Sequence, residues 1–422
     1  MSKTKNAVVI SLDENISEII DLVESLSYTN VKTFIQNKEH PDPNYYVGTG
    51  KIDEIKDFID DYDEKIDLIV VNGKLKPSQW FNLEKKLKVD VFDRVTLILT
   101  IFEKRADRKE ARLQVKLAQL QYQRSFVKEL IHRARSGEHP GFMAGGEYQV
   151  DDYYESIKKQ MKKIKKDLKN ISDDRDLRRI HRQITGFYLV SLCGYTNAGK
   201  SSLLNLLSDE KVKVEDRLFS TLSTTTRRIK HKSIPILLTD TVGFIADLPS
   251  FIIDAFRSTL EEIKLADVVI LVLDISEKKN VITKKLKTSN KELTELEVES
   301  PIVVALNKID LIDEKELSDK LQFIDNLSIF NNRVFVPISV KNNENIEKLL
   351  SAVYNSFPKL VKSVIKLPLN EKSQSLVSLI HDKTNVIDVS YDDFITISFE
   401  CKEEINNRIL SKSKNLNGLI IE

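Results

Sequence analysis

The sequence predicts a multi-unit α/β protein, and three observations support this: the chain length, alternating strand-like and helix-like segments, and a long helical stretch between them. The chain has 422 residues, which is long for one hydrophobic core and favours two to four domains of about 100–200 residues each. We expect an N-terminal parallel α/β domain, a long antiparallel helical hairpin, a second α/β domain and a small α+β C-terminal appendage.

The composition excludes several protein classes. Hydrophobic residues make up 41% and charged residues 31%, with Lys+Arg 65 against Asp+Glu 64 and a net charge of +1, so the chain is neither wholly disordered nor collagen-like. No apolar run reaches the roughly 18–20 residues of a membrane span, and Ala7–Leu12 is too short for a signal-peptide core. Cys193 and Cys401 are too few for a disulfide framework or a four-ligand zinc site. We therefore expect a soluble, cytoplasmic protein.

Residues 1–102 alternate short β-rich runs with amphipathic stretches, which predicts a small parallel α/β domain. Its glycine turn, Gly48–Lys51, opens a helix and resembles half of a nucleotide-binding loop. The turn lacks the longer phosphate-cradling spacing, so a turn-and-cap role is the favoured interpretation. The expected elements are Ala7–Leu12, Ile16–Leu26, Val31–Gln36, Ile52–Ile59, Ile66–Val71, Trp80–Leu87 and Val89–Phe92.

Residues 103–183 predict the helical hairpin. The segment from Glu103 to Arg135 contains neither Pro nor Gly, which favours one long helix, and a glycine-rich loop, Gly137–Gly146, separates it from a second helical pattern. Each helix carries one apolar stripe, and two such helices joined by a short loop fold back on each other. The stripes are Leu113, Leu117, Leu120, Val127 and Ile131 in the first helix, and Ile157, Met161, Ile164, Leu168 and Ile171 in the second.

The second helix of the hairpin is strongly basic. Between Ser156 and Arg182 there are seven Lys and four Arg against four Asp. A lysine-rich helix face is often only a solvated surface. Here the basic stretch Lys158–Arg182 flanks the slender loop Gly137–Gly146, so phosphate attraction and loop insertion would together make an RNA-binding device.

Residues 184–358 again alternate strands and helices, and their short apolar runs are typical of strands buried on both faces. Residues 359–422 form the appendage, with strand-like Ser363–Leu367 and Phe394–Phe399 around helix-like Gln374–Ile380, and nothing in them indicates a function. The expected strands of 184–358 are Tyr188–Leu192, Ile236–Leu238, Val268–Leu273, Ile302–Leu306 and Val334–Pro337.

A phosphate-binding loop follows the first of these strands. The segment Gly194–Ser201 fits the pattern G-x-x-x-x-G-K-[ST] between the strand Tyr188–Leu192 and the helical run Ser202–Leu207. Its backbone N–H groups would surround phosphate oxygens, Lys200 would reach the β- and γ-phosphates, and Ser201 would ligate Mg²⁺. The candidate residues are Gly194, Tyr195, Thr196, Asn197, Ala198, Gly199, Lys200, Ser201 and Ser202.

Three further loops indicate that the nucleotide is GTP or GDP. Asp240, Thr241 and Gly243 lie at a strand end where a carboxylate near Mg²⁺ and a γ-phosphate-sensing glycine are expected. In Asn307-Lys308-Ile309-Asp310 the Asp310 carboxylate can accept hydrogen bonds from both N1–H and N2–H of guanine, a donor pair that adenine lacks. Asn307 would fix the loop and Lys308 would cover the ring. The final base-contacting loop is expected at Ser339, Val340 and Lys341.

The segment Phe219–Arg227 is rich in threonine and lies where a nucleotide-sensing switch would need a Mg²⁺-binding hydroxyl. The residues alone do not decide which threonine supplies it. Phe244 occupies the position where many GTPases carry a water-orienting Gln, and its side chain has no polar atom. No catalytic side chain is assigned, and we expect slow hydrolysis by the protein alone.

Together these residues resemble the HflX-type GTPase family over roughly Val31 to Pro358. The resemblance implies that Phe219 and Thr221 belong to the switch, that Thr221 joins Ser201 and Asp240 at the Mg²⁺ site, and that the protein binds the large ribosomal subunit in splitting or recycling of stalled ribosomes. The segments that carry it are Tyr46–Lys51, Lys76–Gln79, Asp93–Leu99, Arg105–Tyr122, Gly194–Ser201, Phe219–Leu222, Asp240–Phe244 and Asn307–Asp310.

Two segments depart from the family pattern. Met143–Glu147 reads Met-Ala-Gly-Gly-Glu where the family usually has Arg-Gly-Pro-Gly-Glu, and Ser223-Thr224 replaces Asp-Pro in the switch. We therefore expect the loop tip of the hairpin to lack an arginine contact to ribosomal RNA.

The predicted organisation is an N-terminal domain at 1–102, a hairpin at 103–183, a P-loop GTPase domain at 184–358 and an appendage at 359–422. We expect a monomeric, Mg²⁺-dependent GTPase that docks on the large subunit and its RNA, and no membrane or DNA partner. Two alternatives stay open: a regulatory GTP-binding protein with little turnover, acting in ribosome biogenesis or dormancy, and an RNP-remodelling factor with a second nucleotide near Gly48–Lys51.

Overall fold

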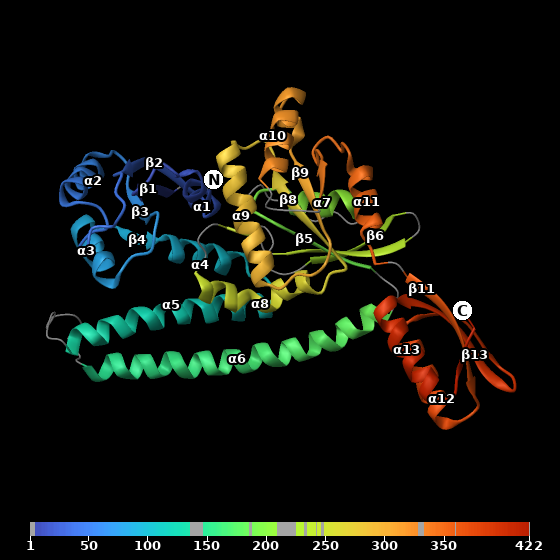
Figure 1. The fold of residues 1–422 in the computed structure, drawn as a ribbon. Coiled ribbons are helices and arrows are strands. Elements are labelled where there is room, and N and C mark those ends of the chain that lie inside the picture. The colour runs from blue at the N-terminus through green and yellow to red at the C-terminus, as the bar shows by residue number, and fades with distance from the viewer. Residues whose placement is uncertain are drawn as a thin grey trace. The chain divides into compact units, whose positions relative to one another are not determined.

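The computed structural model describes residues 5–135, 147–184, 188–208, 225–231, 234–241, 243–245, 249–327, 333–358 and 360–421. Within these ranges the strands form three sheets, each accompanied by helices (Figure 1). The predicted α/β fold class is confirmed.

The N-terminal sheet is parallel, with strand order β2-β1-β3-β4. Parallel neighbours require helical crossovers, and the amphipathic segments predicted between the strands supply them. Ile10 of β1, Ile69 of β3, Ile52 of α2 and Leu83 of α3 share one buried core. The elements are β1 Lys5–Ser11, α1 Ser17–Ser25, β2 Tyr28–Ile35, α2 Thr49–Asp61, β3 Ile66–Val71, α3 Pro77–Leu87 and β4 Asp90–Asp93.

The long helix predicted from Glu103 to Arg135 is present as α5 Lys109–Arg135. Its predicted start is wrong, because Glu103–Arg105 form the end of another helix, α4 Arg94–Arg105. Between them Ala106 has extended backbone (ψ 90°) and is buried. Its carbonyl accepts a hydrogen bond from Nε of Arg112 at 2.9 Å. Neither Pro nor Gly marks this break, which coincides with the burial of Ala106 and with its short-range hydrogen bond to Arg112.

The hairpin pairs α5 with α6 Glu147–Ile184 (Figure 1). The predicted apolar stripes form its interior, and the described members of this core come from both helices. The loop Gly137–Gly146 lies outside the described residues. The buried core members are Leu117, Leu120 and Val127 of α5 and Ile157, Met161 and Ile164 of α6.

The second sheet has six strands in the order β10-β9-β8-β5-β7-β6. All neighbours are parallel except β6, which pairs antiparallel with β7. The last residues of the threonine-rich segment, Thr225–Arg227, lie in β6 rather than in a loop. The strands are β5 Tyr188–Gly194, β6 Thr225–His231, β7 Ile234–Asp240, β8 Val268–Asp274, β9 Ile302–Asn307 and β10 Val334–Pro337, and the helices are α7 Lys200–Leu207, α8 Ser250–Lys264, α9 Lys279–Glu295, α10 Glu314–Asn326 and α11 Ile346–Asn355.

The C-terminal sheet is antiparallel, with strand order β12-β13-β11-β14. Its β-α-β-β-α-β succession is that of the split βαβ, ferredoxin-like fold. Two strands and one helix of it were expected from the sequence, whereas β12, α13 and β14 were not. The elements are β11 Leu360–Pro368, α12 Glu371–Lys383, β12 Asn385–Tyr391, β13 Phe394–Lys402, α13 Glu403–Asn415 and β14 Leu419–Ile420.

The described residues divide into two compact units. One contains β1–β4, α1–α5, most of α6 and the first part of α8. The other contains the end of α6, the remainder of α8, and the two sheets formed by β5–β14 with their helices.

None of the helices in the described ranges is both long enough and apolar enough to cross a membrane.

Both cysteines are free and buried, and burial raises the pKa of Cys193 to about 12 and that of Cys401 to about 11. Both thiols are therefore protonated near neutral pH.

Candidate nucleotide-binding site

The predicted phosphate-binding loop connects β5 to α7, and its two glycines fit where no side chain can. Gly194 has φ +130°, and a Cβ there would lie 2.2 Å from the carbonyl oxygen of Val272 on β8. Gly199 has φ +100°, and its Cβ would lie 2.3 Å from Nδ2 of Asn307. Both positions combine a left-handed backbone with close packing, which only glycine accommodates.

Lys200 begins α7 and curls back over this loop. Its Nζ donates a hydrogen bond to the carbonyl of Tyr195 at 2.6 Å, and only 7% of the residue is exposed. Burial lowers the pKa of Lys200, and the nearby Asp240 carboxylate opposes that shift. A cation held in a poorly solvated loop attracts an anionic ligand more strongly than one in water.

Ser201 and Asp240 meet beside the loop. The Ser201 hydroxyl donates to Oδ2 of Asp240 at 2.7 Å, and Asp240 is buried at the end of β7. The next residue, Thr241, donates its hydroxyl to the carbonyl of Leu192 at 2.7 Å and so ties the turn to β5. A hydroxyl and a carboxylate at one place are oxygen ligands of the kind that Mg²⁺ prefers, so these donors fit the ion.

Gly243 and Phe244 bring the turn after β7 against the phosphate-binding loop. A Cβ on Gly243 would lie 2.9 Å from Nζ of Lys200. Phe244 donates its N–H to the Gly194 carbonyl at 2.9 Å and accepts from the Thr196 N–H at 3.0 Å. The Phe244 side chain is buried, so its ring presents no polar group to a water molecule.

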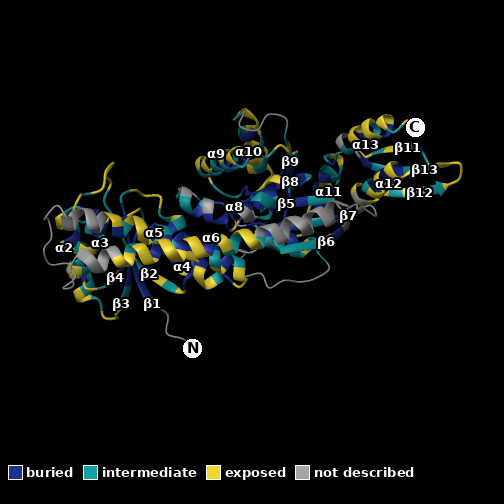
Figure 2. Cartoon of the chain, turned by 90° about the horizontal axis from the view of Figure 1, so that it is seen from below, coloured by how far each residue is buried: buried dark blue, intermediate teal, exposed yellow. Residues whose placement is uncertain are grey.

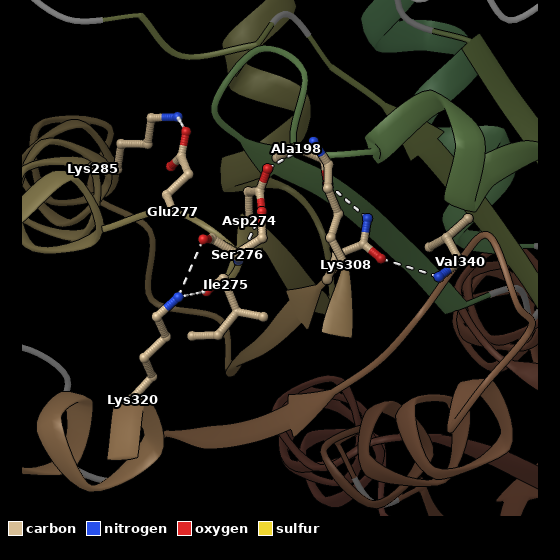
Figure 3. A network of polar contacts seen from close by, with 10 residues as sticks. Ala198, Asp274, Ile275, Ser276, Glu277, Lys285, Lys308, Lys320 and Val340 are labelled. Atoms are coloured by element: carbon tan, nitrogen blue, oxygen red, sulfur yellow. Dashed lines mark hydrogen bonds and ion pairs between the residues drawn. The ribbon is translucent and has the colours of Figure 1, made fainter. Parts of the chain in front are cut away.

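Asn307 connects the phosphate-binding loop to the loop after β10. Its Nδ2 donates to the carbonyl of Ala198 at 2.8 Å, and its Oδ1 accepts from the N–H of Val340 at 3.1 Å (Figure 3). The residue is buried at the end of β9. Two loops predicted to contact opposite ends of a nucleotide are therefore held together by one side chain.

Asp310 and Ser339 form a second link between predicted loops. The Ser339 hydroxyl donates to Oδ1 of Asp310 at 2.6 Å and accepts from the N–H of Asn342 at 3.0 Å. Asp310 lies in a short 3₁₀ helix, Ile309–Leu311, directly after Lys308. Lys341, two residues after Ser339, is exposed. The remaining predicted residue, Ser202, follows Ser201 on α7.

Phe219 and Thr221 lie outside the described residues. Their placement near Ser201 and Asp240 therefore stays a prediction.

Three residues that the sequence reasoning missed support Lys308 (Figure 3). Lys308 has a left-handed backbone, φ +71°, and its Nζ lies 2.7 Å from Oδ2 of Asp274 at the end of β8. The N–H and hydroxyl of Ser276 donate to the other Asp274 oxygen at 2.9 and 2.6 Å. Nζ of Lys320 on α10 donates to the carbonyls of Ile275 and Ser276 at 2.9 and 3.2 Å.

One signal for Asp274 was present in the sequence. Asp274 follows the apolar run Val268–Leu273, just as Asp240 and Asn307 follow their own apolar strands. Carboxyl ends of parallel strands share one edge of a sheet, and ligands bind there in open α/β folds. A polar residue at each strand end was therefore a candidate.

Three family models match the chain. "GTP-binding GTPase N-terminal" covers residues 13–103, "GTP-binding GTPase Middle Region" covers 105–182, and "50S ribosome-binding GTPase" covers 189–308. Together they span the first two predicted units and most of the third.

Similar proteins cover nearly the whole chain. GTPase HflX of Thermococcus kodakarensis is 43% identical over 386 residues, 89% of this chain and 86% of that protein. GTPase HflX of Methanocaldococcus jannaschii is 38% identical over 403 residues, 95% of this chain and 96% of that protein. Among solved structures, the crystal structure of SsGBP in complex with GDP is 30% identical with a TM-score of 0.52, covering 83% of this chain and 98% of that one.

Proposed function

The chain belongs to the HflX family of GTPases, and from this premise we propose that it binds the large ribosomal subunit and uses GTP to time docking and release. The chain is a GTPase of a ribosome-binding family and binds guanine nucleotide. We further propose which subunit it binds, which residues contact the nucleotide and at which cellular step it acts.

We assign the nucleotide contacts as follows. Backbone N–H groups of Gly194–Ser201 and the Lys200 ammonium hold the phosphates, because the loop is glycine-shaped and Lys200 lies over it. Ser201 and Asp240, with Thr221 by the family resemblance, would hold Mg²⁺, which would neutralise phosphate charge. Asp310 and Lys308, with Asn307 and the loop Ser339–Lys341, hold the guanine.

The observation that carries the ribosome proposal is the exposed lysine face of α6. All seven lysines in the described part of this helix are exposed, while Ile157, Met161 and Ile164 are buried. Figure 2 shows exposed residues along much of α6. A dense row of exposed cations attracts the phosphates of RNA, which supports this face as the docking surface. The lysine face consists of Lys158, Lys159, Lys162, Lys163, Lys165, Lys166 and Lys169.

The proposed cellular step is splitting, recycling or rescue of ribosomes, in which the GTP-bound protein docks and hydrolysis releases it. A regulatory protein with little turnover would bind in the same way and not hydrolyse. Single-turnover hydrolysis of GTP on the large subunit separates the two, and we expect one nucleotide hydrolysed for each docking event.

Contacts at the glycine turn Gly48–Lys51 favour one nucleotide per chain. The N–H of Gly48 donates to Oε1 of Gln36 at 2.7 Å, and Nζ of Lys51 lies 2.7 Å from Oε2 of Glu54. These contacts shape the turn, which also lacks the phosphate-cradling spacing of Gly194–Ser201, so we expect one nucleotide per chain. Counting bound nucleotides on the purified protein tests this, and two per chain would favour the RNP-remodelling alternative.

Sedimentation with small subunits, large subunits and intact ribosomes tests the proposed partner, each with GDP or a non-hydrolysable GTP analogue. We expect co-sedimentation with large subunits, stronger with the analogue than with GDP. Equal binding in both nucleotide states would contradict a GTP-timed cycle, and binding to small subunits alone would contradict the partner.

Charge reversal on the lysine face is expected to weaken binding to the large subunit. The variant Lys158→Glu/Lys162→Glu/Lys165→Glu should bind at least about tenfold more weakly at low salt, and the difference should shrink as salt rises, because these contacts are electrostatic. GTP affinity should not change. Binding measured across a salt series checks this.

A matched control for that variant lies on α9. Lys284, Lys287 and Lys291 are also exposed and similarly spaced on one helix, and their reversal changes the net charge by the same amount. This control should bind large subunits almost normally. Equal losses in both variants would mean that net charge, not the lysine face, governs binding.

Asp274 is proposed as a positioning residue for Lys308. The variant Asp274→Asn should weaken GDP binding about tenfold, because the 2.7 Å ion pair that holds Lys308 would be lost. The rate of single-turnover hydrolysis at saturating GTP should stay within about twofold. Calorimetric titration with GDP and rapid-quench hydrolysis check the two quantities.

The control for Asp274→Asn is Asp319→Asn, which removes a 2.6 Å ion pair to Lys279 on the exposed surface. It should leave GDP affinity unchanged, because exposed pairs contribute little. If Asp274→Asn lowered affinity and hydrolysis equally, the residue would be structural rather than a support for Lys308.

A further inference from the structure

A cavity of about 510 Å³ lies in the unit that holds the N-terminal sheet and the hairpin. Its walls come from α3, α4, α5 and α6, and none of the proposed GTP-contacting residues lines it. The volume is in the range of small-ligand sites.

Aromatic side chains held in fixed positions make up much of the cavity wall. Trp80 and Phe126 pack edge to face with ring centroids 5.5 Å apart, and Tyr122 lies 6.1 Å from Phe126. Nε1 of Trp80 donates to the Val91 carbonyl at 2.7 Å, and the Tyr122 hydroxyl donates to Asp93. Tyr122 also stacks on Phe251 with centroids 5.9 Å apart. The rings of Trp80 and Phe126 are therefore held in preformed positions in a wall where a flat ligand could pack.

The polar groups of the cavity suit an uncharged ligand rather than an anionic one. Two carboxylates, Asp93 and Glu103, line it against one ammonium, Lys116, so a phosphate inside would be repelled. The amides of Gln119 and Gln123 supply donors and acceptors, and Gln119 is oriented by a 3.0 Å hydrogen bond to Glu103. Flat faces with a few amides fit a heterocycle that hydrogen-bonds along its edge.

The cavity and the lysine face lie along the same helix, α6. Tyr153 lines the cavity and is 49% exposed, and Lys163 of the lysine face follows it by ten residues, about 15 Å along the helix and about 80° around its axis, a span of a few nucleotides. A ligand that reaches both surfaces therefore combines a flat uncharged ring with phosphates. Single-stranded RNA has this chemistry, since unstacked bases stack on aromatic side chains while the backbone follows cations.

We propose that this cavity receives one unpaired nucleobase of an RNA strand whose phosphates lie along the lysine face of α6. The inference rests on the proposed ribosome binding and gives that binding a second component that reads unpaired bases. The same cavity chemistry would accept a free nucleotide, so the test separates the two sources.

Trp80 is the single tryptophan of the chain, so its fluorescence reports on the cavity. The full-length protein is titrated with single-stranded hexaribonucleotides of each base, with the four nucleoside 5′-monophosphates, and with a duplex of the same length. End-labelled RNA gives total binding by anisotropy. We expect Trp80 fluorescence to change saturably as single strands are added. The affinities obtained with monophosphates and with the duplex, whose bases are paired, should be at least about tenfold weaker.

The diagnostic variant is Tyr153→Ala, chosen because its side chain is half exposed and its loss should not unfold the hairpin. Its Trp80 response to single strands should be about tenfold weaker, the loss of one stacked base. Tyr391→Ala is the matched control, since Tyr391 is 57% exposed on the C-terminal sheet, and its response should be normal. GTP affinity should be unchanged in both.

The outcomes distinguish this inference from the proposed function. If labelled single strands bind while Trp80 does not respond, or responds equally in Tyr153→Ala, the cavity inference is overturned and the ribosome proposal stands. If monophosphates bind as tightly as hexamers, the cavity binds free nucleotides and the proposal that it receives a base of an RNA strand is wrong. A Trp80 response to large subunits and to no single strand would assign the cavity to a protein side chain instead. If neither RNA nor subunits bind, both proposals fail.

Discussion

Replacing Asp310 with asparagine is expected to weaken GTP binding by at least about a hundredfold and to shift base preference toward xanthosine nucleotides. The carboxylate would accept two hydrogen bonds from guanine, each of about 1.5–3 kcal/mol for a charged acceptor. An amide keeps one acceptor and places a donor where guanine also has a donor. Xanthine carries a carbonyl at that position, so the same amide donor meets an acceptor.

The measurement is competitive binding of GDP and xanthosine diphosphate to both proteins. Asp325→Asn, an exposed aspartate on α10, is the matched control and should bind GDP normally. A variant that lost GDP affinity without gaining xanthosine affinity would indicate damage to the hydrogen bond by which Asp310 links its loop to that of Ser339. Unchanged GDP affinity would mean that Asp310 does not contact the base.

The elements of the GTPase unit could be predicted from the sequence because each strand and loop has a recognisable pattern within a few consecutive residues. The strands β5, β7, β8 and β9 are continuous apolar runs, and their bounds in the structure extend the predicted ones by only a few residues. Glycines at Gly194 and Gly199 are required by the backbone itself. Each polar loop then follows a strand end, so the sequence order alone brings the loops to one edge of the sheet.

Contacts between distant segments were not predictable in this way. The ion pair between Lys308 and Asp274 joins two loops 34 residues apart in sequence, and only the register of β8 with β9 brings them together. The break at Ala106 was missed for another reason, because no Pro or Gly marks it in the sequence and the residue is buried. The predicted boundaries at 102, 183 and 358 stay predictions.

The C-terminal appendage shows a second limit. The strand β12 was missed because its residues are mostly exposed or half-buried, so no apolar alternation marks it. The strand β14 has only two residues and owes its existence to pairing with β11. Neither feature can be recognised without the sheet that surrounds it.

Large ribosomal subunits are expected to accelerate GTP hydrolysis by two orders of magnitude or more, within the roughly 10⁵-fold range that activating partners supply. Phe244 offers no polar atom to orient water, and its backbone is bonded to Gly194 and Thr196 of the phosphate-binding loop. The protein alone therefore lacks, at this position, the group that many GTPases use. A partner that supplies a water-orienting group and excludes bulk solvent would have a large effect.

Multiple-turnover hydrolysis measured alone, with small subunits and with large subunits checks this expectation. Small subunits should have little effect. In the variant Lys158→Glu/Lys162→Glu/Lys165→Glu the stimulation should need higher subunit concentrations yet reach the same maximum, because those lysines are proposed to affect docking and not chemistry. A lower maximum in that variant would place the lysine face in the activation step itself. Equal rates with and without large subunits would contradict a timer and favour a regulatory GTP-binding protein.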